Sequence, residues 1–399
     1  MLQGGDTVPK KDLLAAMRLG EQLTLRQQIM LTLQLSIPAI LAQISSIVMQ
    51  YIDAAMVGHL GKEASASIGL VASSTWLMGG LCRALAVGFS VMVAQRIGAG
   101  DERDARNLVK QGLCSGIAVG LLLAAVGAAI SGGLPHWLRA DAAICPDASS
   151  YFLIFALSLP FVQLNRLAAG LLQAGGNMRT PSVLMALMCG LDVVFNALLI
   201  FPTRQVGAFT LPGANMGVAG AALGTALSEA TVAIVMCVLL LRSPVLGLRR
   251  DERLRFIPAQ LRRALTLSVP VAIEQAVMTS AQVVTTGIIA PLGTVAIAAN
   301  SFAVTAEALC YMPGYGVQSA AVTLIGQSVG ARRKDIVTRL GWVTVLLGMS
   351  IMLAAAVAMY ALAPWIIGML SPDQQVVALG TLVLRIVVFA EPLFGASIV

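Results

Sequence analysis

Two aspartates and an asparagine, Asp53, Asp192 and Asn196, lie in segments that are otherwise almost entirely apolar. Asp192 and Asn196 are four positions apart, so a helix would present both on one face. At about 1.5 Å of rise per residue, Asp53 and Asn196 lie at nearly the same depth, roughly 9 Å below the ends of their segments. We therefore expect the three side chains to converge. Carboxylates inside a membrane commonly mark ion or proton pathways, so the group is predicted to bind a coupling cation; the alternative is a structural hydrogen-bond network.

Other charged side chains lie in similar surroundings. A charge at bilayer depth costs about 2.5–3.5 kcal/mol on insertion scales, so each should face protein or water. Arg83 and Arg166, at similar depths, either pair with a buried acid such as Glu229, or snorkel, or form a selectivity element. Acids outnumber arginines in these segments, which favours cationic substrates. The acids are Asp53, Asp192, Glu229, Glu274, Glu307 and Glu391, and the arginines are Arg83, Arg166 and Arg385.

Long apolar helices are the elements that must position these side chains. Of the 399 residues, 58% are hydrophobic and 11% are charged, against roughly 45–50% and about 25% in an ordinary globular domain. A spanning helix needs about 20 apolar residues. The sequence therefore predicts an all-α polytopic membrane protein, with spans near 29–54, 66–95, 109–131, 149–174, 181–201, 217–242, 264–290, 295–328, 338–368 and 377–399.

The same features argue against several classes of function. His59 and His136 fall in loops and the six cysteines form no CxxC pair, so we expect no metal site, no catalytic residues and no structural disulfide. The net charge of +7 comes from loop bases without aromatic interleaving, unlike a nucleic-acid surface. The glycines near 98–104 have no lysine at Walker spacing, which argues against an ATP site. Energy should therefore come from an ion gradient, with no cofactor and with H⁺ or Na⁺ as the coupling ion.

The basic residues also orient the chain. With the N-terminus inside, roughly 20 of the 26 lysines and arginines fall on the inner side, as the bias of cytoplasmic loops requires. The outer loops hold only Lys62, Arg139 and Arg204. We predict a multi-pass inner-membrane protein with a cytoplasmic N-terminus. Residues 1–28 form a cytoplasmic leader, in which residues 11–28 are either an amphipathic helix on the membrane surface or part of a disordered or solvated segment.

An internal repeat runs through the chain. Residues 36–99 match residues 268–331 without a gap, and the identities include Pro38/Pro270, Gln43/Gln275 and Gly98/Gly330. Apolar composition alone would not align prolines, glutamines and glycines in register.

The repeat predicts two pseudo-symmetric helix bundles, 29–242 and 264–399, joined by a charged cytoplasmic linker, 243–263. Both repeats begin on the same side, so a two-fold axis along the membrane normal should relate them. Transporters use this arrangement to rock two bundles about a central cavity. Six helices in the first bundle imply six in the second, of which about four are expected here.

Several segments together resemble the multidrug and toxic compound extrusion (MATE) family. They are YIDAAMVGHLG (51–61), VAQRIGAGDERDAR (93–106), GLLQAGGNMRTP (170–181), LDVVFNALLIFP (191–202), GVAGAALGTALSE (217–229), SVPVAIEQA (268–276) and the segment 290–331. The resemblance implies twelve helices in two lobes and the export of organic cations and other amphiphiles in exchange for Na⁺ or H⁺. It also implies that this bacterial chain is truncated within helix 10, in FAEPLFGASIV.

The resemblance also assigns residues. Asp53 corresponds to the family's helix 1 acid, and Asp192 and Asn196 to its helix 5 pair in reversed order. The sodium-coupled branch has an acid where this chain has Met278, so the second-lobe sodium site should be absent or rebuilt. The side chains expected to line the substrate cavity instead are Glu274, Glu307, Tyr311, Tyr315, Gln318, Arg83 and Arg166. A structural role is the alternative for the two glutamates, the two tyrosines and the glutamine.

A lipid-linked oligosaccharide flippase of the same broad superfamily is the alternative function, and it would need a large basic cavity. A membrane-embedded enzyme would need a convergent catalytic set, and the sequence has neither GxSxG nor HExxH. The expected partners are a small organic substrate and membrane lipid, without nucleic acid or ATP, and the expected state is a monomer.

Overall fold

The computed structural model describes residues 13–19, 21, 23–138, 141–206, 209–247, 255–370 and 373–399. The long helices are α2 (Leu25–Gly58), α3 (Lys62–Gly98), α4 (Glu102–Ser131), α6 (Cys145–Ala174), α7 (Arg179–Leu199), α8 (Gly217–Leu241), α9 (Pro258–Ile289), α10 (Thr294–Gly330) and α11 (Lys334–Leu370). The short elements are α1 (Leu13–Leu19), α5 (Leu134–Trp137), β1 (Pro202–Val206), β2 (Phe209–Ala214), η1 (Ala290–Leu292), α12 (Gln374–Val387) and α13 (Glu391–Ile398).

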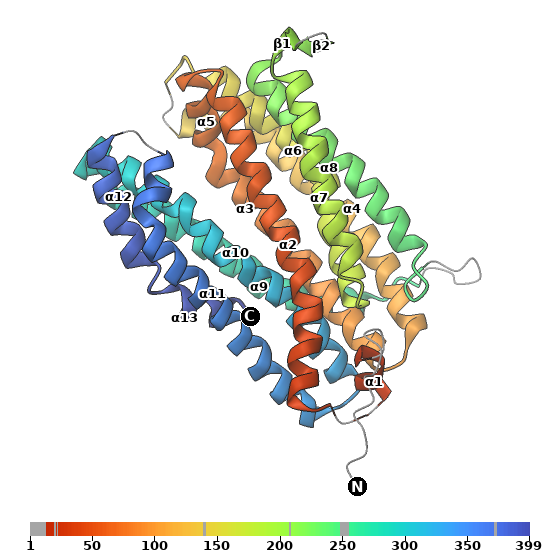
Figure 1. Cartoon of the computed structure of the whole chain (residues 1–399). Coiled ribbons are helices and arrows are strands. Elements are labelled where there is room, and N and C mark those ends of the chain that lie inside the picture. The colour runs from red at the N-terminus through yellow and green to blue at the C-terminus, as the bar shows by residue number, and fades with distance from the viewer. Residues whose placement is uncertain are drawn as a thin grey trace.

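The helices form two groups that approach each other near α1 and separate toward the β1–β2 hairpin (Figure 1). We call α2–α4 and α6–α8 the first bundle and α9–α13 the second bundle. The two ends of the molecule are called the α1 end and the hairpin end.

The protein is a multi-pass membrane protein. Within the described ranges, nine helices are long and apolar enough to cross a membrane, and the bent pair α12–α13 adds a tenth. These helices coincide with the ten expected spans, and several run beyond them; α3 and α10, for example, have 37 residues each. Hydropathy marks only the part of a helix that faces lipid, whereas the polar turns at its ends stay helical outside that layer.

The last span is broken, although the sequence predicted one segment over 377–399. α12 and α13 meet at a bend of 52°. Pro392 occupies the first turn of α13, and a proline inside a continuous helix would lack an N–H donor and clash with the carbonyl four residues earlier. The break leaves Glu391 buried at the start of α13.

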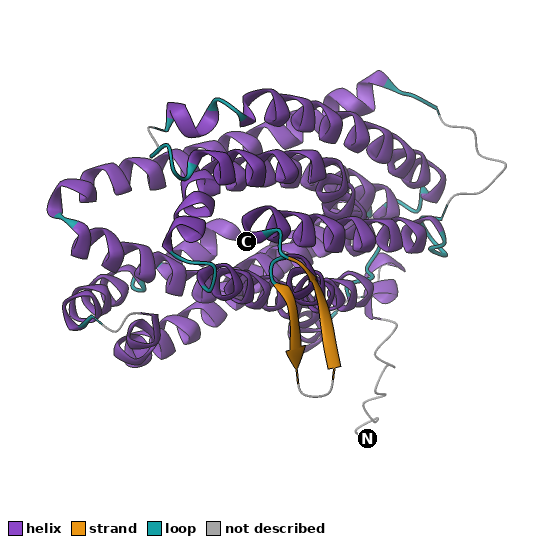
Figure 2. Cartoon of the chain, turned by 90° about the horizontal axis from the view of Figure 1, so that it is seen from above, coloured by secondary structure: helices purple, strands orange, loops and turns teal. Residues whose placement is uncertain are grey.

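A short β-hairpin interrupts the otherwise helical fold. β1 and β2 pair antiparallel from Pro202/Ala214 to Val206/Phe209, and the hairpin projects away from the helices (Figure 2). It connects α7 to α8 at the end of the bundle, outside the apolar part of either helix. The expectation of an all-α fold therefore holds for the membrane-spanning part.

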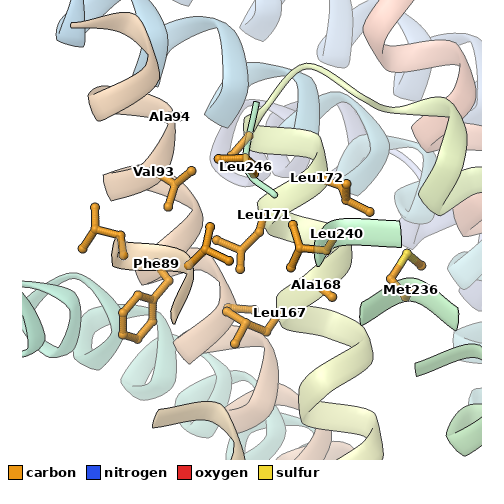
Figure 3. Close-up of a cluster of buried hydrophobic side chains, with 14 of the residues drawn as sticks. Phe89, Val93, Ala94, Leu167, Ala168, Leu171, Leu172, Met236, Leu240 and Leu246 are labelled. Atoms are coloured by element: carbon orange, nitrogen blue, oxygen red, sulfur yellow. The ribbon is translucent and has the colours of Figure 1, made fainter. Parts of the chain in front are cut away.

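The first bundle has a continuous apolar core near the α1 end. α3, α4, α6 and α8 contribute almost fully buried side chains, among them Phe89, Leu108, Leu171 and Met236. Figure 3 shows the side chains of α3, α6 and α8 meeting in this cluster. Gly120 of α4 lies so close to Pro160 of α6 that a side chain there would overlap with the α6 backbone. Small residues of this kind let membrane helices pack backbone to backbone.

The two bundles meet where α3 crosses α10 at the α1 end. A Cβ atom at Gly98 would overlap with the Gln327 backbone, and one at Gly330 would overlap with the Gln95 backbone. The internal repeat matches Gly98 with Gly330 and Gln95 with Gln327. The crossing is therefore reciprocal, as a two-fold relation between the two helices would make it.

Other matched positions also share their local conformation. Pro38 and Pro270 lie inside α2 and α9, and Gly61 and Gly293 precede α3 and α10 with φ of 118° and 100°. α2 packs against α10 while α9 packs against α3. The boundaries of the two lobes stay a prediction, and residues 248–254 of the expected linker lie outside the described ranges.

The described C-terminal part of the linker is anchored on α4. Asn107 exchanges two hydrogen bonds of 3.0 Å with the backbone of Arg255, and Gln260 donates to Asp104 at 2.8 Å. α9 begins at Pro258, earlier than the expected residue 264, because proline fits the first turn of a helix.

α1 packs against both bundles. Leu13, Ala16 and Met17 are buried in a cluster with side chains of α2, α10 and α11. Arg18 Nε donates to Gln327 Oε1 at 2.9 Å. The described part of the leader is therefore docked on protein, which neither interpretation of residues 1–28 anticipated.

Met17→Asp should detach α1 and weaken the contact between the bundles at this end. Met17 is 1% exposed, and losing a buried methionine side chain costs about 2–5 kcal/mol. We expect the midpoint of thermal unfolding in detergent to fall by several degrees. Ala15→Asp is the matched control, because Ala15 is on the exposed face of α1. Equal midpoints for the two variants would contradict the docking role.

Gly330→Ala should hold the bundles apart at the α1 end, because the new methyl group would overlap with the Gln95 backbone. We expect spin labels at the exposed positions Arg103 and Lys334, in a cysteine-free background, to report longer distances than in the parent. Gly58→Ala is the control, since no atom lies near its added Cβ. An unchanged distance distribution in Gly330→Ala would mean that the crossing is not limiting.

Candidate functional site

α2 and α7 lie side by side and bring Asp53, Asp192 and Asn196 together. The Asn196 amide Nδ2 donates to Asp53 Oδ1 at 2.8 Å and to Asp192 Oδ2 at 3.0 Å. Asp192 and Asn196 are fully buried and Asp53 is half-buried. The two carboxyl groups also face each other closely enough to share a hydrogen bond. We call these three residues the acid cluster.

α6 and α8 complete the surroundings of the acid cluster. Ser228 donates to Asp192 Oδ1 at 3.3 Å, and the Tyr151 hydroxyl is close enough to interact electrostatically with both carboxyl groups. The side-chain carbonyl oxygen of Asn196, Oδ1, lies against Gly224 and has no hydrogen-bond partner among the described residues. The amide N–H, rather than the carbonyl, therefore faces the two acids.

Two carboxyl groups in contact at this depth cannot both be ionised without a compensating positive charge. The acid cluster is therefore favourable with one shared proton or with one bound cation. Release or uptake of this proton or cation would change the charge between α2 and α7 by one unit. The arrangement can thus act chemically as a proton or cation site.

A second polar site is a cavity between the bundles, walled by α2, α3, α6, α7 and α10. Four of the predicted cavity residues lie in its wall: Arg83, Arg166, Tyr315 and Gln318. Its other polar lining residues are Gln43, Ser90, Asn165, Gln173, Ser319 and Thr323. Its larger apolar lining residues are Val87, Pro181, Met185 and Val322, with several alanines between them.

Arg83 and Tyr315 join the two bundles in this cavity. The guanidinium carbon of Arg83 lies 4.0 Å from the centroid of the Tyr315 ring, a cation–π contact. Tyr311 supports Tyr315 edge-on, with 6.1 Å between ring centroids. Of the alternatives for Arg83, pairing with a buried acid is thus replaced by stacking on an aromatic ring.

Arg166 of α6 and Glu229 of α8 attract each other electrostatically. Glu229 of α8 is buried and accepts a 2.7 Å hydrogen bond from Asn165 Nδ2. Arg166 interacts electrostatically with Glu229 but exposes its side chain and lines the cavity. The expected pairing of Arg166 with Glu229 is therefore an electrostatic attraction, and the two side chains form no direct ion pair in the described part of the chain.

Three residues expected in the cavity wall are not placed there: Glu274, Glu307 and Tyr311. α9 turns Ser268 and Gln275 toward glycines of α3, so Glu274, rotated about 100° from Gln275 on the helix, is exposed on another side. Tyr311 lies one turn from Tyr315 and packs against it and Phe394. Neither depth in the membrane nor a family resemblance fixes the direction in which a helix faces, so the sequence could not place these three side chains.

Glu307 faces a second carboxyl group, that of Glu391. The sequence places both acids within spans but does not predict that they pair. Pro392, directly after Glu391, was the available signal, because it breaks the helix and exposes a half-helix start. Both acids lie in the second bundle, and neither lines the cavity.

Three amide side chains of the cavity wall, Gln43, Asn165 and Gln173, were not predicted from the sequence. Asn165 and Gln173 flank Arg166 on α6, and the pair Gln43/Gln275 stood out in the repeat. Polar residues on the same face as a membrane arginine were therefore a usable signal.

Comparisons with known proteins agree on one family. The family model described as MatE matches residues 38–198 and 270–399. A relative named "Probable multidrug resistance protein NorM" from Thermotoga maritima is 24% identical over 361 residues, covering 89% of this chain and 75% of that protein. A relative of the same name from Bradyrhizobium diazoefficiens is 28% identical over 336 residues, covering 82% of this chain and 69% of that protein.

A solved structure has the same fold. It is described as an outward-facing conformation of a multidrug resistance MATE family transporter of the MOP superfamily. The TM-score is 0.84 at 21% identity, and the match covers 98% of this chain and 82% of that one.

Gly224→Ala should disrupt the acid cluster without removing any polar group, because its methyl would overlap with the Asn196 carbonyl. Overpacking of this kind costs about 1–3 kcal/mol, and the displaced amide would no longer bridge Asp53 and Asp192. We expect a lower thermal midpoint and slower transport. Gly190→Ala on α7 is the control, since its added Cβ has no neighbour; equal behaviour of the two variants would contradict the prediction.

Proposed function

The chain belongs to the MatE family, and from this premise we propose that it exports amphiphilic organic compounds across the bacterial inner membrane in exchange for protons. It is a membrane transporter by family. The multidrug names of its relatives support an exporter of small organic molecules and do not favour the flippase alternative. Proton exchange at Asp53 is the central element of the proposal.

The observation that carries the proposal is the bridging of two acids by one amide. Asn196 holds Asp53 and Asp192 together inside the first bundle at 2.8 and 3.0 Å. Two neighbouring carboxyl groups avoid carrying two negative charges when they hold one proton or one cation, so the site is a natural place to bind and release that charge. Asp53 is the more exposed of the two acids, so it is the acid from which a proton would leave.

The geometry favours a proton over sodium. A sodium ion between the acids would use the Asn196 carbonyl as a ligand, but that carbonyl lies against Gly224. The amide Nδ2 instead occupies the position between the two carboxyl groups. A shared proton fits this arrangement directly, whereas sodium would require the amide to turn over.

The charge distribution supports a cytoplasmic α1 end. The bases of the loops at this end outnumber those at the hairpin end, as in cytoplasmic loops generally. With this orientation, the close crossing of Gly98 and Gly330 shuts the cytoplasmic side. The acid cluster then lies in the half nearer the outside, where protons would enter.

Asp53→Asn should abolish proton-coupled export in proteoliposomes. The amide keeps the shape of the side chain but cannot bind a proton at neutral pH. With a fluorescent dye that the wild type extrudes, we expect the rate driven by a pH gradient to fall at least about tenfold, a loss of about 1.4 kcal/mol or more of transition-state stabilisation. Asp335→Asn, in an exposed ion pair on α11, is the control and should transport normally.

Wild-type export by Asp53→Asn under the same gradient would refute the coupling role. A sodium gradient, applied without a pH gradient, tests the second ion. If only sodium drives the wild type and Asp53→Asn abolishes that flux, the site stands but its ion is Na⁺.

A further inference from the structure

The wall of the inter-bundle cavity carries positive charge and no negative charge among the residues described. Arg83 and Arg166 line it, and no aspartate or glutamate does. The acids counted from the sequence lie elsewhere: in the acid cluster, behind Asn165, on the exposed side of α9, and in the Glu307–Glu391 pair. The excess of acids that favoured cationic substrates therefore does not reach the cavity.

Arg83 is held in place without being neutralised. Its guanidinium stacks on Tyr315 at 4.0 Å, and no carboxylate forms an ion pair with it in the described part of the chain. Stacking uses the flat face of a guanidinium and leaves the N–H groups at its edge free to donate. Those edge donors match a carboxylate, sulfonate or phosphate group.

Arg166 presents a second charge to the same space. Its side chain is exposed and lines the cavity, while Glu229, with which it interacts electrostatically, is buried and already bound by Asn165. Glu229, which is buried and does not line the cavity, offsets part of the positive charge of Arg166. The guanidinium edge toward the cavity therefore keeps its donors for a ligand.

The same wall also has apolar residues. α2 contributes Ala39 and Ala42, α7 contributes Pro181 and Met185, and α10 contributes Val322. A ligand that matches both parts has one charged end and one apolar body. Pockets for small molecules commonly combine an apolar lining with a few placed polar groups.

We propose that the exported substrate is an amphiphilic organic anion, whose carboxylate, sulfonate or phosphate group binds to Arg83 and Arg166. Its apolar body lies against α2 and α7. The inference rests on the proposed function for the role of the cavity as the transport site. It replaces the cationic substrate expected from the sequence.

Binding of two probes of equal shape and opposite charge tests the inference. The probes are 2-naphthalenesulfonate and 2-naphthylmethylammonium, titrated calorimetrically into the chain in lipid nanodiscs with empty nanodiscs as the blank. We expect the sulfonate to bind more tightly than the ammonium. Arg83→Gln and Arg166→Gln should each weaken sulfonate binding about tenfold, since each removes charge-assisted hydrogen bonds.

Arg385→Gln is a matched control. Arg385 lies in a span and stacks over Tyr360 at 5.0 Å, but it does not line the cavity, so sulfonate binding should not change. Because Arg166→Gln leaves Glu229 without its nearby positive charge, it is also tested together with Glu229→Gln. Tighter binding of the ammonium, or unchanged sulfonate binding in both arginine variants, would overturn the inference.

The electrical sign of transport provides a second test. Export of a monoanion for one proton moves two positive charges inward, whereas exchange of a monocation for a proton moves none. An inside-negative potential should therefore accelerate export at constant pH gradient. Asp53→Asn should retain sulfonate binding, because Asp53 lies outside the cavity. Loss of coupling in Asp53→Asn and loss of binding in the arginine variants are thus separate outcomes, and either can fail alone.

Discussion

The hydrogen bonds from Asn196 to two carboxyl groups are the interaction on which the first bundle depends. Without this amide, Asp53 and Asp192 would face each other in an apolar interior with no donor between them. Because Asp53 belongs to α2 and the other two residues to α7, the network also fixes how these helices pack. α2 in turn packs against α10 of the second bundle. A change of charge at the acid cluster would therefore act on a helix that contacts both halves of the molecule.

Two contacts between α3 of the first bundle and α10 of the second bundle differ in kind. At the α1 end, α3 and α10 approach through Gly98 and Gly330, where no side chain intervenes, and α1 covers the junction through Met17 and Arg18. Farther along the same two helices, the contact is between Arg83 and Tyr315. The contact through the two glycines is a close backbone packing, which exists only while the bundles are close together. The second contact is electrostatic, and it leaves the N–H groups at the edge of the guanidinium available to a ligand in the cavity.

The sequence predicted the features that depend on composition, depth and repetition. Apolar length gave the ten spans, and equal depth with a four-residue spacing brought Asp53, Asp192 and Asn196 together. It could not predict the direction in which α9 faces, since that depends on contacts such as Gln275 against Gly80; Glu274 was misplaced for this reason. The break at Pro392 and the docking of α1 likewise depend on tertiary packing, which outweighs the local pattern that hydropathy detects.

α8 and α6 connect the acid cluster to the cavity. Ser228 and Glu229 are neighbours on α8; Ser228 donates to Asp192, while Glu229 binds Asn165 in the cavity wall. Asn165 precedes Arg166, whose charge is attracted to Glu229. A shift of α8 that follows a change at Asp192 would therefore also move the group that balances Arg166. Because neither site contains the other's residues, this shared backbone is the physical route by which the proposed proton exchange at one could alter the affinity for the proposed substrate at the other.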